Sequence, residues 1–155
     1  MNMNRTNQLS RVKGFTLIEI MVVIVILGIL AGLVVPNIMG NLGKANIQKA
    51  ISDVSALENA LNMYKTDNYR YPTTDQGLEA LVEETDIDPV PRRFQPGGYI
   101  NRLPQDPWGN EYVLISPGEF GNIDVFSPGE DGEAGTDDDI GNWNLEEWRS
   151  GKTKD

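Results

Sequence analysis

Residues 14–36, GFTLIEIMVVIVILGILAGLVVP, decide the fold of this chain. From Phe15 to Val35 the run is apolar except for Thr16 and Glu19. In a helix, which rises about 1.5 Å per residue, the run is about 30 Å long and matches the hydrocarbon core of a bilayer. We therefore predict that residues 15–36 form a transmembrane helix.

The residues before this run form a short basic leader. It contains Arg5, Arg11 and Lys13 and no acidic residue. A basic leader followed by an apolar run is also typical of a secretory signal peptide, but there the apolar region has about 7–15 residues and ends at a small-residue cleavage site. Here the run is longer, and the small residue Gly14 precedes it. The pattern therefore favours a membrane span over an ordinary signal peptide.

Glu19 places a carboxylate inside the apolar run. Inserting one costs roughly 2.5–3.5 kcal/mol at the centre of a span and less near an end. One interpretation is that Glu19 lies close to the membrane surface, stays solvated and has no role. The other is that the chain is cut after Gly14, which gives Phe15 a positive α-amino group about one helical turn away. That amine neutralises the carboxylate within one chain or between neighbours.

The segment Lys13-Gly14-Phe15-Thr16-Leu17-Ile18-Glu19 resembles the class III signal of type IV pilins and pseudopilins. The resemblance implies that a prepilin peptidase in the membrane cuts between Gly14 and Phe15 and methylates the new amino terminus. It also implies that Glu19, with Thr16, acts in filament assembly by pairing with the amine of a neighbouring subunit. Pro36 then marks a segment that unwinds when the subunit leaves the membrane. A plain single-pass anchor is the alternative.

The charge of the chain is unevenly distributed. The leader holds three of the 13 basic residues and none of the 23 acidic ones, and the apolar run adds only Glu19, so residues 37–155 carry 10 basic and 22 acidic side chains. A basic leader inside and an acidic body outside is the orientation that the positive-inside rule predicts. The acidic body also argues against nucleic-acid binding, which requires a basic surface.

The length of 155 residues accommodates one membrane span and one small globular domain. We expect a leader at 1–14, the span at 15–36 and the domain at 37–155. The chain has no Cys and no His, so it forms no disulfide and lacks the commonest general base and transition-metal ligand. We find no catalytic triad and no Gly-rich phosphate loop, and we expect a structural protein rather than an enzyme.

The body is expected to be α+β. Apolar residues recur at helical spacing beyond the span and predict that the helix continues to about Thr66 with one buried stripe: Ile47, Ile51, Val54, Leu57 (or Leu61) and Tyr64. A short helix is predicted at 77–84, and a hairpin with strands at 111–115 and 122–126. Trp143 should fold beside the loop that it closes, and the polar tail from Glu146 should fray.

Residues 71–81 and 106–109 narrow the resemblance. YPTTDQGLEAL and DPWG are similar to the major pseudopilins of type II secretion systems. This implies a type IV pilin-like fold and a short periplasmic filament anchored in the bacterial inner membrane. It implies as partners other copies of the chain, minor pseudopilins and an inner-membrane assembly platform. Type IV pilins proper usually close a C-terminal disulfide loop, which a chain without Cys cannot form.

Residues 127–141, SPGEDGEAGTDDDIG, hold six acidic residues interleaved with glycines. So many carboxylates repel one another unless a cation lies among them, and calcium prefers 6–8 oxygen ligands. On composition alone a disordered acidic loop is an equal alternative. The pseudopilin resemblance implies calcium here, with the ligands carried by the side chains of Asp131, Asp138 and Asp139 and by backbone carbonyls near Pro128, Glu133 and Gly135.

The resemblance therefore implies that the chain is the major subunit of a secretion pseudopilus that pushes exported proteins through an outer-membrane channel. Two alternatives stay open. One is a type IV or competence pilin. The other is a membrane-tethered calcium-binding protein that never polymerises, and Glu19 discriminates because a mere tether should tolerate its replacement.

Overall fold

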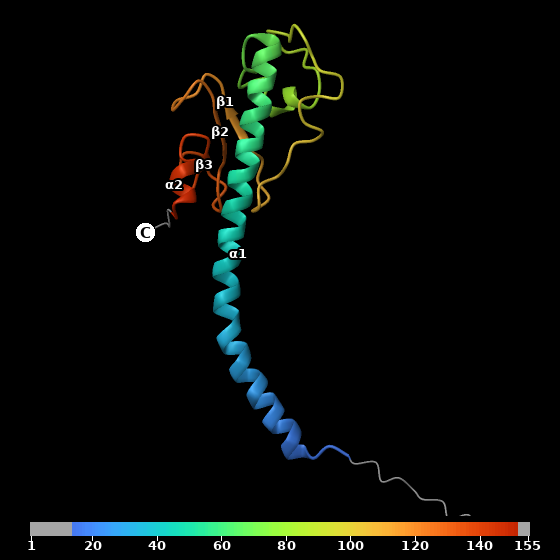
Figure 1. Ribbon diagram of the computed structural model, residues 1–155, viewed down its shortest axis with the longest axis vertical. Helices are drawn as coiled ribbons and strands as arrows, with labels where there is room; N and C mark the ends of the chain where they lie inside the picture. Colours follow the sequence, from blue (N-terminus) through green and yellow to red (C-terminus); the bar gives the residue numbers. More distant parts are fainter. Residues whose placement is uncertain (1–13, 152–155) are drawn as a thin grey trace, which may run out of the picture. The chain divides into compact units, whose positions relative to one another are not determined.

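The computed structural model describes residues 14–151, with side chains described for 14–31 and 42–151. Its elements are helix α1 (Leu17–Asn68), the 3-10 helix η1 (Leu78–Leu81), strands β1 (Val113–Ile115), β2 (Asp124–Ser127) and β3 (Ile140–Gly141), and helix α2 (Leu145–Arg149) (Figure 1). The chain forms two compact units, residues 1–41 and 42–155. Most of the predicted leader and the side chain of Pro36 lie outside the described residues.

In the first unit, every residue from 14 to 31 is exposed. The exposed fraction is 82% for Leu17 and 59% for Leu27. Apolar side chains are normally exposed singly, and a continuous run of them marks a surface that another apolar phase covers. Among the residues that the structure describes, no helix has a long enough apolar stretch to cross a membrane. The predicted span continues through residues 32–36, whose side chains are outside the description.

The second unit is built around one face of α1. Because apolar residues recur there every three or four positions, they line one side of the helix and pack against the sheet and the loops. The stripe predicted from the sequence is confirmed from Ile51 to Tyr64, and Ile47 packs against it half-buried. The core includes Ile51, Val54, Leu57, Leu61 and Tyr64 of α1 together with Leu81, Leu114, Val125, Ile140 and Trp148.

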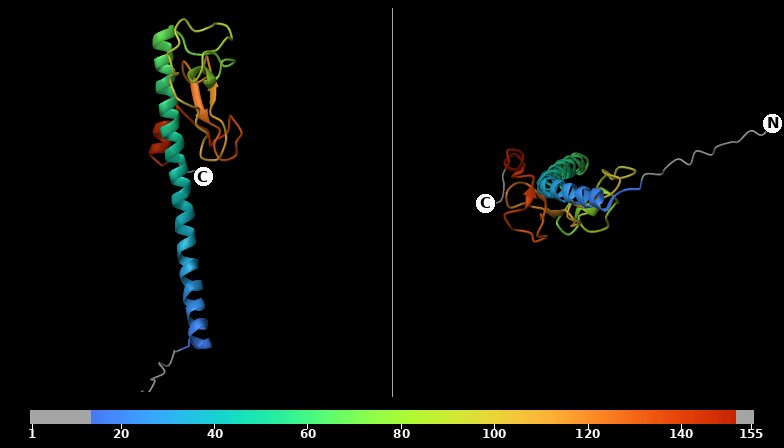
Figure 2. Two further views of the ribbon diagram at one scale, coloured as in Figure 1. Left: turned by 90° about the vertical axis from the view of Figure 1, so that its right-hand side faces the viewer. Right: turned by 90° about the horizontal axis from the view of Figure 1, so that it is seen from below.

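The sheet is antiparallel with the order β1-β2-β3. Val113 pairs with Phe126 between the first two strands, and Ser127 pairs with Ile140 between the second and third. The sheet lies beside the C-terminal half of α1, and α2 follows β3 (Figure 2). The predicted α+β class with a small antiparallel sheet is confirmed.

Several predicted bounds were wrong. The helix expected at 77–84 is only the 3-10 turn Leu78–Leu81, and it starts after Gly77 because the φ of that residue, +62°, is not helical. Before β1, Glu111 makes a single bridge to Gln105 rather than a strand. The tail was predicted to fray from Glu146, but residues 145–149 form α2 and bury Trp148.

Candidate functional site

The predicted processing and assembly residues lie at the start of α1. Gly14 and Phe15 precede the helix and are exposed. The Thr16 Oγ1 atom accepts a hydrogen bond from the Glu19 main-chain N–H at 3.3 Å. The Thr16 N–H and hydroxyl both lie 3.3 Å from Glu19 Oε2, to which they donate. This is a capping box, in which a Thr and a Glu three residues later satisfy each other's backbone donors at a helix start.

Glu19 therefore has a local role that the sequence analysis missed. The spacing Thr-x-x-Glu before an apolar run is a signal for a capping box and was available in the sequence. The contact does not exclude a second role in assembly, since the capping bonds use only Oε2. Two properties of the Glu19 side chain can therefore be tested separately, its acceptor oxygen and its charge. A capping box needs an acceptor oxygen, which Gln also has, whereas pairing with an amine needs the negative charge.

The first half of the acidic loop wraps around the Asp138 carboxylate. Its Oδ2 atom accepts hydrogen bonds from the main-chain N–H groups of Glu130 at 3.0 Å and Asp131 at 3.2 Å. Its Oδ1 atom lies 2.6 Å from the Thr136 hydroxyl. The same hydroxyl lies 3.4 Å from Asp131 Oδ1. The structure therefore brings the predicted ligands Asp131 and Asp138 to one threonine, which the sequence analysis did not single out.

Asp139 is the most buried of the three aspartates predicted as ligands. Its side chain is 6% exposed, and Oδ2 accepts the Gly135 N–H at 2.8 Å. Its Oδ1 atom is buried without a hydrogen-bond partner among the described residues. Burial raises the pKa of the Asp139 carboxyl, and the negative charges of Asp138 and Asp131 raise it further. A buried anionic oxygen without a donor is costly and is normally paired with a cation or hydrogen-bonded.

The remaining predicted ligands are backbone positions along the same loop. Pro128 is buried, whereas Glu133 and Gly135 are exposed. The Glu133 carbonyl oxygen lies 3.1 Å from the Thr136 hydroxyl oxygen. A cavity of about 490 Å³ opens beside the loop and is lined in part by Asp139, Thr136 and Trp143. Trp143 thus lies beside the loop, as predicted, and stacks on Phe120 with ring centroids 4.5 Å apart.

The candidate ligand atoms are of the type that a hard cation binds. All are oxygens, as calcium requires, and Asp139 Oδ1 is left without a partner. Across the part of the chain that the structure describes, however, no three acidic side chains stand close enough together to hold a metal ion as they are. The carboxylates of Asp131, Asp138 and Asp139 are therefore not gathered around one point in this structure.

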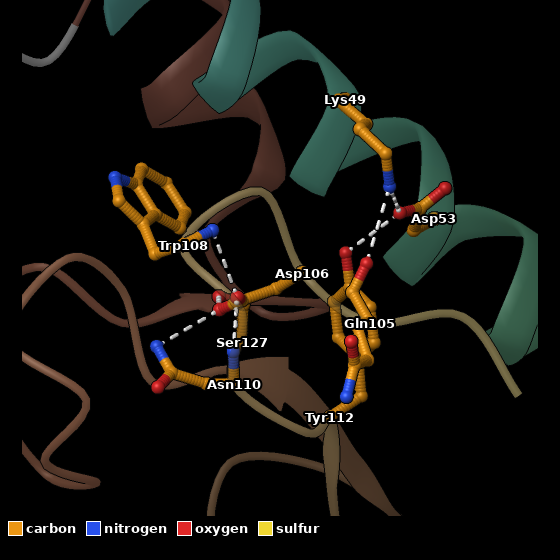
Figure 3. A network of polar contacts seen from close by, with 8 residues as sticks. All are labelled: Lys49, Asp53, Gln105, Asp106, Trp108, Asn110, Tyr112 and Ser127. Carbon is orange, nitrogen blue, oxygen red and sulfur yellow. Dashed lines mark hydrogen bonds and ion pairs between the residues drawn. The ribbon is translucent and has the colours of Figure 1, made fainter.

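A second polar cluster lies under the start of the acidic loop and was not identified from the sequence beyond a turn. Figure 3 shows Asp106 at its centre, with hydrogen bonds to Trp108, Asn110 and Ser127. Asp106 is 5% exposed. Beside it, Asp53 of α1 accepts hydrogen bonds from Lys49 and from the Tyr112 hydroxyl, the latter at 2.8 Å.

Comparison with known families gives two matches to this chain. Residues 37–143 match the family model described as type II secretion system, protein G. Residues 9–35 match the prokaryotic N-terminal methylation motif. The second match spans the apolar run as far as Val35, and the first spans most of the body.

Individual relatives agree with the family models. The type II secretion system core protein G of Aeromonas hydrophila is 68% identical over 142 residues, which cover 92% of this chain and 99% of that protein. Its counterpart in Escherichia coli K12 is 64% identical over 133 residues, which cover 86% of this chain and 92% of that protein. A crystal structure of the major pseudopilin from the type 2 secretion system of enterohaemorrhagic Escherichia coli has 58% identity and a TM-score of 0.65, covering 72% of this chain and 97% of that one. The chain therefore belongs to the type II secretion system protein G family, the major pseudopilins.

Proposed function

We propose that this chain is the major structural subunit of a type II secretion pseudopilus. It polymerises into a helical periplasmic filament that helps to push folded exoproteins through the outer-membrane secretin. The observation that carries the proposal is the run of residues 14–31, in which every residue is exposed although nearly all are apolar. Lipid covers such a surface before assembly, and other copies of the same helix cover it in a filament.

The subunit occupies two locations in turn, the inner membrane and then the filament. The subunit is first held in the inner membrane by residues 15–36, with its acidic body in the periplasm. Prepilin peptidase cuts between Gly14 and Phe15 and methylates the new amine, in keeping with the methylation motif matched at residues 9–35. An inner-membrane assembly platform then adds subunits to the filament, and minor pseudopilins accompany the homopolymer.

Glu19 guides each incoming subunit through its charge. The positive amine of Phe15 and the Glu19 carboxylate neutralise each other between neighbouring copies, because an unpaired carboxylate among apolar helices is costly. Before the amine of a neighbouring copy binds, Thr16 positions the Glu19 carboxylate through the capping box. Pro36 interrupts the helical hydrogen bonding and allows the segment around it to unwind.

The acidic loop holds a calcium ion in this proposal. Asp131, Asp138 and Asp139 supply carboxylate oxygens, and the carbonyls of Pro128, Glu133 and Gly135 complete the set. The unpartnered Oδ1 of buried Asp139 supports this assignment. Calcium neutralises the mutual repulsion of the loop's carboxylates and fixes a segment that no disulfide can fix in a chain without Cys.

Intact-mass spectrometry of the protein purified from its own membranes tests the processing step. A species that begins at Phe15 and carries one added methyl group is expected. A species that still begins at Met1, in cells that contain the peptidase, would leave a membrane tether that never polymerises as the better account.

A further inference from the structure

The base of the acidic loop is tied to the turn formed by residues 106–110, DPWGN. Asp106 Oδ1 accepts the main-chain N–H groups of Trp108 at 3.0 Å and Asn110 at 2.7 Å, which closes the turn. Its other oxygen, Oδ2, accepts the Ser127 hydroxyl at 2.6 Å and the Asn110 side-chain amide at 3.3 Å (Figure 3). One buried carboxylate thus joins the turn to the end of β2.

Both connections continue to Gly129, the third residue of the loop. The Asn110 Nδ2 atom donates to the Gly129 carbonyl at 2.9 Å. The Gly129 N–H donates to Ser127 Oγ at 3.1 Å. Since both backbone groups of Gly129 are held by side chains that Asp106 itself binds, the position of Gly129 is fixed by the turn.

Gly129 in turn lies directly against Asp138. A Cβ atom at Gly129 would come within 2.6 Å of both the main-chain oxygen and the Oδ2 atom of Asp138. Gly129 also has a φ of +72°, a conformation that L side chains rarely adopt. The next two N–H groups along the chain, from Glu130 and Asp131, are the ones that bind Asp138 Oδ2. Any shift of Gly129 therefore moves the donors that orient this carboxylate.

We infer that Asn110, Asp106 and Ser127 are positioning residues for the cation site: they hold Gly129, and through it the carboxylate of Asp138, in place for calcium. The inference rests on the calcium binding proposed above. None of the three residues is itself a ligand, and each acts through Gly129. Groups that orient metal ligands from outside typically change metal affinity by about 10–100-fold when they are removed.

The test is a calcium titration by isothermal calorimetry on the full chain in detergent, after calcium has been stripped with a chelator. Asn110→Ala removes the amide that binds the Gly129 carbonyl. We expect its Kd for calcium to rise by about 10–100-fold over the wild-type value. Direct binding is measured, rather than stability alone, because a merely structural role would lower the melting temperature and leave Kd unchanged.

Tyr112→Phe is the matched control. Tyr112 is two residues from Asn110 in the chain. The substitution removes its 2.8 Å hydrogen bond to Asp53 and leaves the acidic loop untouched. It should lower stability while its Kd stays within about twofold of wild type. Ser127→Ala is the second positioning variant and decides the question if Asn110→Ala does not fold, since it removes only one hydroxyl.

The outcomes separate the two claims. A wild-type chain that binds no calcium overturns the calcium proposal and this inference with it. A wild-type chain that binds calcium, with Asn110→Ala or Ser127→Ala binding equally well, overturns the positioning role alone. A rise in Kd for both variants, with the Tyr112→Phe value unchanged, supports it.

Discussion

The Trp148 indole N–H donates a 3.1 Å hydrogen bond to the main-chain carbonyl of Asp139. The same carbonyl accepts the Asn144 side-chain amide at 2.9 Å. Helix α2 is thereby fastened to the last residues of the acidic loop, while the turn at 106–110 holds the loop's first residues. The loop is thus anchored to buried groups at both ends, although its middle is exposed.

Trp148→Phe should destabilise the protein by about 1–3 kcal/mol. The change removes a donor from a buried carbonyl and leaves the smaller ring with unfilled space in the core. Urea unfolding followed by circular dichroism measures the loss. Trp143→Phe is the control, because Trp143 is only partly buried and packs against the exposed Phe120. Equal stability of wild type and Trp148→Phe would show that α2 is not held as described.

Gly129→Ala should cost more stability than Gly135→Ala when both are measured in chelator. Both glycines have positive φ, at +72° and +90°, so each substitution strains the backbone by about 1–2 kcal/mol. Only at Gly129 does the added Cβ also meet Asp138, at 2.6 Å, whereas open space surrounds Gly135. Chemical denaturation of the two variants gives the difference. Equal losses would mean that Gly129 and Asp138 are not in close contact.

Stability should fall as the pH rises from about 10 to about 12, partly because of Tyr99. Burial, followed by the hydrogen bond and charge of Asp67, raises the pKa of Tyr99 to about 12 from its ordinary value of 10.0. The unfolded chain therefore loses this proton first, so the stabilisation is complete below pH 10 and is lost as the pH passes the folded pKa. Unfolding free energies from pH 9 to 12 measure the slope, and absorbance at 295 nm follows the phenolate.

Tyr99→Phe provides the comparison for that slope. The variant cannot ionise at this position, so its stability should decline less steeply over the same range. Burial also raises the pKa values of Tyr64 and Tyr112, so a residual decline is expected in the variant. An identical slope in the two proteins would place the pKa of Tyr99 at its ordinary value.

Calcium should raise the melting temperature of the protein, and a chelator should lower it. At a concentration of about 100 times Kd, binding to the folded state alone adds about 2.7 kcal/mol, on the order of 10 °C for a small domain. Asp139→Asn removes the charge of the buried carboxylate and should abolish most of this shift. Differential scanning calorimetry in calcium and in chelator gives both numbers. Equal melting temperatures of the wild type in calcium and in chelator would exclude the proposed site.

The sequence predicted those features that depend on local periodicity. The stripe from Ile51 to Tyr64 followed from helical spacing, and the apolar run at the amino end followed from composition. Features that join distant segments were not predictable in this way. Trp148 was assigned to a polar tail. The carbonyl that it binds belongs to Asp139, nine positions earlier, and α2 has only five residues, so neither feature gave a periodic signal.

The candidate site was predicted unevenly for the same reason. Acidic residues and glycines marked the loop at 127–141, and the structure brings Asp131 and Asp138 to a common hydroxyl. The hydrogen bond from Asn110 to Gly129 was not predictable because the two residues lie 19 positions apart in the chain. The capping box of Thr16 and Glu19 was local and visible, but a carboxylate in an apolar run drew the interpretation toward assembly.

Filament assembly by Glu19→Gln tests the central claim most directly. Glutamine keeps the oxygen that the capping box needs and removes only the charge, so the start of α1 is preserved. The measurement is the amount of filament released when the outer membrane is opened and seen by electron microscopy, with the membrane-bound subunit quantified alongside. We predict normal insertion, normal cleavage after Gly14 and no filaments. Filaments at the wild-type level from Glu19→Gln would contradict assembly through the charge of Glu19.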